Sequence, residues 1–168
     1  IGINMDLSPV VDIPVSTDFI YTRSFSTDLN LTTEFTRNII KMMNENNIIS
    51  CMKHFPGYGN NVDTHTCILI DEIEYCNLKN SDFIPFEDGI KNNAPTILIS
   101  YNIVSCMDKD LPDSSSKNFH NILRNDLNFS ELINTDDLAM DAVKNYVNYD
   151  NAAIQAILSC NDMILSSD

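Results

Sequence analysis

The sequence predicts an α/β protein built around a parallel β-sheet. Five short apolar segments have the length and composition of buried strands, at about residues 2–7, 48–53, 96–100, 131–135 and 162–166. Apolar residues at helical spacing occupy the connections between these segments. Because strands that alternate with helices form βα units, we expect five parallel strands with helices between them.

Each connection between the expected strands carries its own helical pattern. The apolar positions are Leu31, Phe35, Ile39, Met42 and Met43 in the first connection, Phe83, Phe86 and Ile90 in the second, Phe119, Ile122 and Leu123 in the third, and Val143, Val147, Ile154, Ile157 and Leu158 in the fourth. Recurrence at three or four residues predicts a helix in each connection. His120 lies in the third pattern without any motif around it, so we expect it on the surface.

The composition is that of a globular domain. Hydrophobic residues make up 43% of the chain, and no apolar run approaches the ~20 residues that span a bilayer, so no membrane segment is expected. The net charge of −14 comes from 24 acidic and 10 basic residues. Such a chain repels phosphate backbones and offers no basic patch, which argues against nucleic acid as a partner.

The cysteines are odd in number and scattered, at positions 51, 67, 76, 106 and 160. This spacing supports neither a zinc site nor a disulfide framework. We expect Cys51, Cys106 and Cys160 to be buried, because they lie in or beside apolar strands. Free thiols favour the cytoplasm only weakly, since a signal peptide would lie upstream of this segment, so the localisation stays open.

The most informative segment is 53–59, which reads Lys-His-Phe-Pro-Gly-Tyr-Gly and is followed by Asp63, Thr64 and His65. It comes directly after an apolar strand. Glycine and proline let the backbone turn tightly and approach a ligand, while the polar side chains supply contacts and proton transfer. These features indicate a strand that ends in a functional loop; a purely structural loop is the alternative.

This segment, with the Asp-x-His after it, resembles the signature of family 3 glycoside hydrolases of the bacterial β-N-acetylhexosaminidase type. Residues 2–12, followed by Arg23-Ser24-Phe25, resemble an upstream strand and Arg-Ser-Phe element of that family. Residues 135–140, which read Thr-Asp-Asp-Leu-Ala-Met, resemble its nucleophile segment. The three similarities occur in the right order and extend over essentially the whole chain.

The resemblance implies a (β/α)8 TIM barrel, whereas five strands supply only part of one. A closed barrel of this type typically takes ~250 residues, and the chain has 168 and begins at Ile1 without an initiator methionine. We therefore expect a partial barrel of about five βα units, matching the fourth to eighth strands. Residues 1–168 would then be the C-terminal part of a single catalytic barrel domain whose first units lie upstream.

Asp136 is the candidate nucleophile. Retaining glycosidases need a carboxylate on one face of the sugar and a proton donor on the other, and barrels of this type carry their active sites where the strands end. Asp136 directly follows an expected strand, and the resemblance gives it the nucleophile's position. Alternatively, Asp136 or Asp137 caps the helix that begins near Leu138. We expect Asp137 to be the helix-start or orienting carboxylate.

The resemblance gives the proton-donor role to His65 rather than to a second carboxylic acid. An imidazole titrates near neutrality without special burial. Asp63, two residues earlier, is placed to accept a hydrogen bond from the ring and so to fix its tautomer. We expect the two side chains to act as one acid/base unit.

The resemblance also implies that Lys53, His54 and Arg23 bind the sugar, since lysine and arginine donate to several oxygens at once. For Lys53 the alternative is a salt bridge at the barrel mouth. No cofactor is implied. Tyr101 departs from the family pattern, because it follows the 96–100 strand where a histidine is usual.

The expected function is retaining exo-β-N-acetylglucosaminidase activity on terminal β-linked N-acetylhexosamine residues. Carbohydrate substrates of this kind include muropeptides, as in peptidoglycan recycling, and chitin oligosaccharides. One alternative is a phosphorylase of the same family, and another is an inactive truncated barrel or a sugar-binding module. A metal hydrolase that uses His54, Asp63, His65 and Asp136 as ligands is a further alternative, although a metal-binding spacing is absent.

Overall fold

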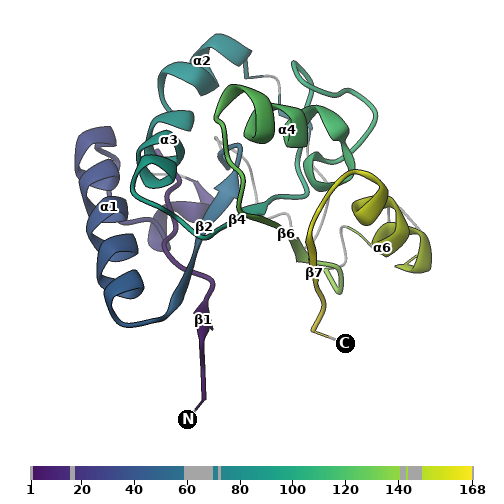
Figure 1. Ribbon diagram of the computed structural model, residues 1–168. Helices are drawn as coiled ribbons and strands as arrows, with labels where there is room; N and C mark the ends of the chain where they lie inside the picture. Colours follow the sequence, from purple (N-terminus) through teal and green to yellow (C-terminus); the bar gives the residue numbers. More distant parts are fainter. Residues whose placement is uncertain are drawn as a thin grey trace.

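A computed structural model of the protein describes residues 2–15, 18–58, 70–71, 73–140, 143 and 149–167. Five strands form one parallel sheet in the order β1-β2-β4-β6-β7 (Figure 1). These strands are β1 (Met5–Asp6), β2 (Ile49–Phe55), β4 (Thr96–Ile99), β6 (Leu132–Asp137) and β7 (Met163–Leu165). The five expected strands are therefore confirmed, with β1 shorter than expected.

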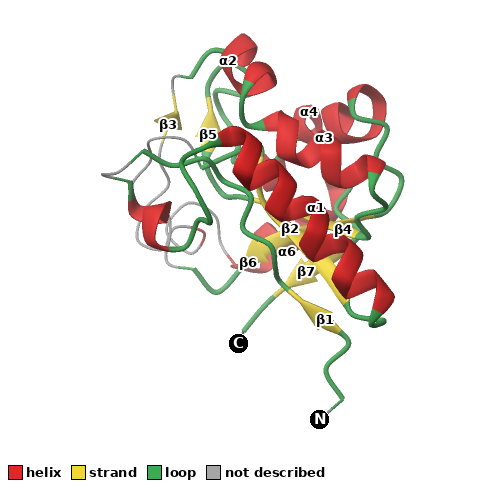
Figure 2. Ribbon diagram, turned by 90° about the vertical axis from the view of Figure 1, so that its left-hand side faces the viewer, coloured by secondary structure: helices red, strands yellow, loops and turns green. Residues whose placement is uncertain are grey.

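Two further strands were not expected from the sequence. β3 (Ile70–Asp71) pairs in parallel with β5 (Ile103–Val104) and forms a second small sheet, apart from the main one (Figure 2). A strand of two residues is too short to show an alternating pattern, so sequence periodicity carries no signal for it.

Every connection between neighbouring strands of the main sheet contains helical structure, as predicted. The elements are η1 (Phe19–Thr22), α1 (Leu29–Glu45), α2 (Tyr75–Asn80), α3 (Phe83–Lys91), η2 (Asp113–Ser115), α4 (Lys117–Asn121), η3 (Ile122–Asp126) and α6 (Tyr149–Leu158). The position of Val147 in the fourth pattern lies outside the described residues. None of the helices in the described part of the chain is long and apolar enough to cross a membrane.

The longest helix, α1, does not bury the face that its apolar pattern suggests. Asp28 caps its first turn by accepting a hydrogen bond from the backbone N–H of Leu31, at 2.9 Å. Leu31 and Met42 are more than half exposed. The buried positions are Thr32, Thr36, Ile40 and Met43. The helix is thus rotated by about one residue, so that two small threonines face the interior.

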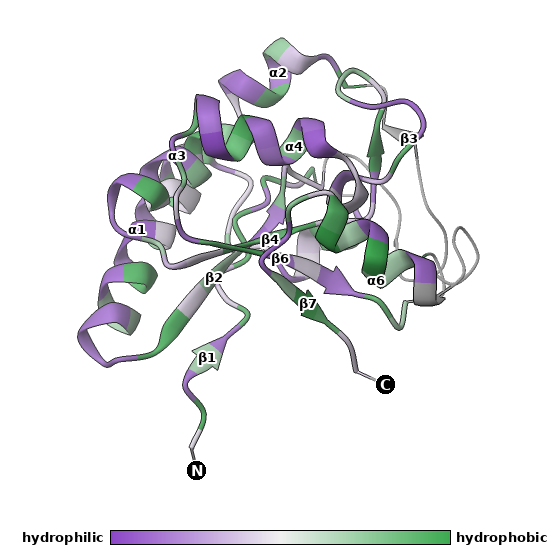
Figure 3. Ribbon diagram, turned by 45° about the vertical axis from the view of Figure 1, so that its right-hand side comes forward, coloured by the Kyte–Doolittle hydropathy of each residue, from purple (hydrophilic) through white to green (hydrophobic). Residues whose placement is uncertain are grey.

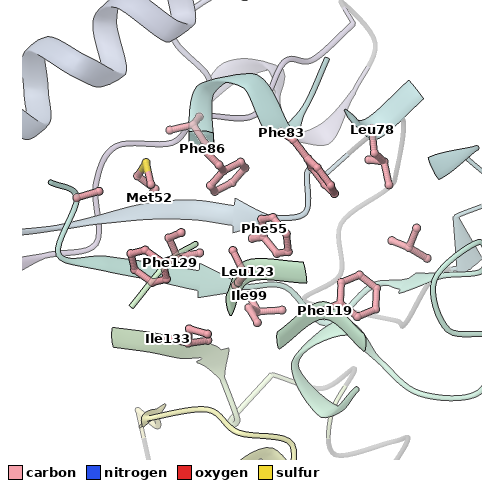
Figure 4. Close-up of a cluster of buried hydrophobic side chains, with 14 of the residues drawn as sticks. Met52, Phe55, Leu78, Phe83, Phe86, Ile99, Phe119, Leu123, Phe129 and Ile133 are labelled. Atoms are coloured by element: carbon pink, nitrogen blue, oxygen red, sulfur yellow. The ribbon is translucent and has the colours of Figure 1, made fainter. Parts of the chain in front are cut away.

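The hydrophobic core lies between one face of the sheet and the helices α1 to α4 (Figures 1 and 4). The register places Met52, Ile97 and Ile133 side by side across β2, β4 and β6, and all three are buried in this core. The strands β4 and β7 are mostly apolar, β6 turns polar toward its end, and polar and apolar residues mix along α1 and α4 (Figure 3). Because side chains alternate along a strand, the residues between these positions face the opposite side of the sheet.

The sheet is open and curled. Within the described residues β1 pairs only with β2, and β7 pairs only with β6, so these two strands form its edges. The observed architecture is therefore an α/β half-barrel. The closed eight-stranded barrel implied by the resemblance stays a prediction.

Three residues differ in burial from expectation. His120 is buried, with an exposed fraction of 2%, and its Nδ1 donates a hydrogen bond to the Ser116 carbonyl at 2.9 Å. The expectation of a surface histidine was therefore wrong, and burial lowers the pKa of this imidazole. Cys106 and Cys160 are exposed rather than buried, because each follows the end of its strand or helix. Cys51 is buried as expected, and burial raises the pKa of its thiol to about 11.

Candidate active site

The described candidate residues gather at the carboxyl-terminal edge of the sheet. Lys53 and His54 lie near the end of β2, and Asp136 lies near the end of β6. Arg23 directly follows η1, in the connection between β1 and α1. In parallel α/β folds the carboxyl ends of the strands share one edge, and the loops beyond it form the active site. The motifs that are distant in sequence thus converge on one edge.

Lys53 and Asp136 face the same side of the sheet, opposite to the hydrophobic core. Met52 and Ile133 face the core. Because side chains alternate along a strand, Lys53, one residue after Met52, and Asp136, three residues after Ile133, face the other side. Burial, and then the positive charge of Arg23, lower the pKa of Lys53, while the charge of Asp136 raises it. Arg23 and Asp136 therefore act on the charge of Lys53 in opposite directions.

His54 is the best-fixed side chain of the site. It is 2% exposed, and its Nδ1 lies 2.8 Å from Oδ2 of Asp12. Its Nε2 lies 3.4 Å from Nη2 of Arg23. The ring also meets the Tyr58 ring edge-on, with the centroids 5.3 Å apart. A chain of contacts therefore runs from the buried Asp12 through His54 to the exposed Arg23.

Asp12 is a residue of the site to which the sequence assigned no role. It is 2% exposed and lies in the segment after β1, which runs beside β2 through a hydrogen bond from the N–H of Val11 to the carbonyl of Lys53, at 2.8 Å. The available signal was the position of a carboxylate directly after the apolar pair Val10 and Val11. That position indicates a strand end, but not the partner 42 residues away.

The two adjacent aspartates at the end of β6 make different contacts. Oδ1 of Asp137 accepts hydrogen bonds from the backbone N–H of Ala139 at 2.9 Å and of Ser167 at 3.1 Å. It therefore holds the turn after β6 and the segment after β7 together. Asp136 accepts the backbone N–H of Asp137 at 2.9 Å and is only partly buried. This geometry suits an accessible carboxylate at Asp136 and a structural one at Asp137.

Gly57 lets the loop after β2 pass close to the start of α3. Its φ of +137° lies in a region that residues with a side chain rarely adopt. A Cβ atom at this position would lie 2.6 Å from Oδ1 of Asp82. The glycine in the Lys-His-Phe-Pro-Gly segment is therefore required by both conformation and space.

Tyr101 belongs to a small buried cluster. It is 2% exposed and packs with Leu138 and Met140, in the segment that follows Asp136. Burial raises the pKa of its hydroxyl group strongly, so this group stays protonated at physiological pH. Tyr101 thus packs against the segment that follows Asp136.

The proposed acid/base pair, Asp63 and His65, lies outside the described residues. Of the four ligands considered for a metal hydrolase, only His54 and Asp136 are described. Among the residues that the structure places, no three or more His, Cys, Asp or Glu side chains cluster as a metal site.

The fold and these contacts together define a class of protein. The described chain is an α/β half-barrel, an open parallel sheet with charged side chains at the carboxyl ends of its strands, which is the edge where α/β enzymes carry their active sites. The whole chain, residues 1–168, matches the sequence model of the glycosyl hydrolase family 3 N-terminal domain. The protein therefore belongs to glycosyl hydrolase family 3.

Several curated relatives carry the name β-hexosaminidase. The chain is 29% identical to the one from Nitrosomonas eutropha, over 99% of this chain and 49% of the relative. It is 32% identical to the one from Photobacterium profundum, over 97% of this chain and 49% of the relative. The chain thus spans about half the length of the curated relatives it matches.

Solved structures share the fold. CbsA from Thermotoga neapolitana superposes with a TM-score of 0.90 at 26% identity, over 99% of this chain and 37% of that one. A family 3 β-N-acetylglucosaminidase from Paenibacillus superposes with a TM-score of 0.91 at 24% identity, over 98% of this chain and 32% of that one. The half-barrel described here is therefore a substructure of larger chains.

Proposed function

We propose that the protein containing this chain is a retaining exo-β-N-acetylglucosaminidase. The observation that carries the proposal is the position of Lys53 and Asp136 near the ends of β2 and β6, with Arg23 in contact with His54. Family membership and the β-hexosaminidase relatives support the same conclusion. The substrate is a glycan with a terminal β-linked N-acetylhexosamine, such as a muropeptide or a chitin oligosaccharide.

In the first step, a carboxylate oxygen of Asp136 attacks the anomeric carbon. The bond between that carbon and the leaving oxygen breaks, and His65 gives its proton to that oxygen. The product is a glycosyl-enzyme ester on Asp136. Lys53, His54 and Arg23 surround the sugar, and the donors of lysine and arginine hold its hydroxyl oxygens in place.

In the second step, water replaces the leaving group. His65 takes a proton from the water, the water oxygen bonds to the anomeric carbon, and the ester bond to Asp136 breaks. Asp63 holds the imidazole through both steps. Two inversions at the same carbon retain its configuration.

The central test is the replacement of Asp136 by asparagine in the full-length protein. We expect a loss of nearly all turnover with little change in thermal stability, because Asp136 is partly accessible and makes few contacts. Asp137→Asn is the matched control: Oδ1 of Asp137 accepts both backbone N–H groups, and the amide oxygen of asparagine can take its place, so most activity and most thermal stability should remain. A mechanism-based fluorosugar should label Asp136, as read by mass spectrometry. An adduct on another residue would remove Asp136 from the nucleophile's role.

Two alternatives stay open within the same test set. A phosphorylase would form a sugar phosphate, so product formation would depend on inorganic phosphate. An inactive barrel remnant would show no turnover of any aryl β-N-acetylglucosaminide. Specificity is tested with the matching β-glucoside, which we expect to be cleaved much more slowly.

A further inference from the structure

Asp12 binds the end of β2 through three hydrogen bonds. Its Oδ1 accepts the backbone N–H of Tyr58 at 2.8 Å. Its Oδ2 accepts the backbone N–H of His54 at 3.2 Å and lies 2.8 Å from Nδ1 of the same residue. Both oxygens thus act as acceptors, and the side chains of Asp12 and His54 are only 1% and 3% exposed. Nδ1 of His54 must therefore carry the proton in this contact.

The other ring nitrogen of His54 meets a group that only donates. Nε2 lies 3.4 Å from Nη2 of Arg23, and a guanidinium has five N–H donors and no acceptor. A proton on Nε2 would point at another proton. The two partners together fix the imidazole as the neutral tautomer with the proton on Nδ1 and the lone pair on Nε2.

We propose that Asp12 is a positioning residue that sets the tautomer of His54 and, through it, holds the Arg23 guanidinium toward the substrate. Arg23 belongs to an exposed connection after η1, where a long side chain has many rotamers. The Nε2 lone pair selects one of them. The role of Arg23 toward a sugar rests on the proposed function, whereas the tautomer of His54 does not.

The first test reads the tautomer directly in the full-length protein. Histidine labelled with nitrogen-15 gives distinct NMR signals for protonated and unprotonated ring nitrogens, and a His54→Gln variant assigns the signals of His54. At pH 7 we expect a protonated Nδ1 and an unprotonated Nε2. A proton on Nε2 alone, or on both nitrogens, would overturn the proposal. This measurement does not depend on how any variant at position 12 folds.

The second test uses Asp12→Asn, which keeps the shape but has one acceptor oxygen where Asp12 has two. The NH2 group of the asparagine then points either at the Tyr58 N–H or at the backbone N–H and Nδ1–H of His54. All of these groups are donors, so the hydrogen bonds on that side are lost. Loss of these bonds should raise KM for an aryl β-N-acetylglucosaminide by about ten- to a hundredfold, with a smaller change in kcat. The His54 ring signals should change at the same time. Asp12→Glu, which keeps both acceptor oxygens, should recover part of the loss.

Asp28→Ala is the control, because Asp28 also accepts a backbone N–H, that of Leu31 at the start of α1, and alanine removes this acceptor. It should lower thermal stability without changing KM or the His54 signals. If Asp12→Asn behaves in the same way, Asp12 is merely structural and the proposal fails. A wild-type protein without hydrolytic activity would contradict the proposed function instead, and the NMR result would still decide the role of Asp12.

Discussion

Lys53 shows how the site holds a concentrated positive charge beside its carboxylate. Burial and the neighbouring Arg23 both disfavour the ammonium form, which is why the pKa of Lys53 is lowered. Asp136 acts in the opposite direction and offsets part of this cost. Lys53 therefore loses its proton at a lower pH than an ordinary lysine, and the sugar binding proposed for its ammonium group is present below that lowered pKa and lost above it. Asp136, the proposed nucleophile, is thus the group that most favours the charged form of Lys53.

The proposed acid/base role of His65 can be tested through the leaving group. Replacing His65 with glycine should slow substrates with poor leaving groups most, because an activated phenol departs with less need for a proton. Asp63→Asn should show the same pattern in a weaker form. The measurement is kcat/KM across aryl β-N-acetylglucosaminides whose phenols differ in pKa. Equal losses across that series would assign His65 to binding instead.

Among single residues, the sequence indicated the candidates that lie inside a recognisable motif. It gave no role to Asp12, whose partner His54 is distant in sequence. Lys53 and His54 share a motif, and Arg23 and Asp136 stand in the two flanking ones. Asp12 acts on His54 across 42 residues, and only the pairing of the post-β1 segment with β2 brings them together. No local pattern encodes that pairing.

The helices α1, α3 and η3 are each followed by an asparagine in the left-handed conformation before the next strand of the main sheet begins. Asn47 after α1, Asn93 after α3 and Asn128 after η3 all adopt the left-handed conformation, with φ between 55° and 61°. After α1 and α3, an N–H one residue further on bonds back to the last helical turn. Asparagine tolerates this conformation better than most residues. The chain has only 4 glycines, so asparagine fills the place that glycine usually takes.

The connection from α6 to β7 uses Cys160 instead, with a φ of +81°. A left-handed residue with an ordinary side chain costs about 1–2 kcal/mol of strain, which glycine removes. Glycine also gives the unfolded chain more conformational entropy, which lowers the free energy of unfolding by about 0.4–1 kcal/mol. Cys160→Gly should therefore raise the free energy of unfolding of the full-length protein by about 0.5–1 kcal/mol, as measured in urea. Asn128→Gly is the control and should gain less. A Cys160→Gly variant that is no more stable than wild type would argue against strain at this position.

Periodicity predicted which elements exist but not how they are oriented. The five main strands and the helices between them follow from alternating apolar segments. The rotation of α1, which buries Thr32 and Thr36 in place of Leu31, depends on how closely the helix approaches the sheet and its neighbours. Small side chains allow that approach, and the hydrophobic pattern of a single helix does not report it.

At the scale of the whole molecule, the half-barrel leaves apolar surface at both ends. α1 and α6 lie at opposite ends of the sheet (Figure 1). On α6, Ile154, Ile157 and Leu158 are 58%, 51% and 60% exposed, and their spacing places them on one face. On α1, Leu31 and Met42 are likewise exposed. Together with the edges at β1 and β7, these faces are the positions that neighbouring βα units cover in a closed barrel.

The 168-residue chain expressed alone should therefore associate or lose its fixed packing, and it should be inactive although it contains both catalytic candidates. The unpaired N–H and C=O groups of an edge strand can form hydrogen bonds with a strand of another chain, and exposed apolar faces favour aggregation. A whole domain is stable by only about 5–15 kcal/mol, so there is little margin for exposing these surfaces. Size-exclusion chromatography, thermal unfolding and a hydrolysis assay test this, with the full-length protein as control. A monodisperse, cooperatively unfolding and active monomer would contradict the prediction, because the open sheet would then suffice without the units that close the barrel.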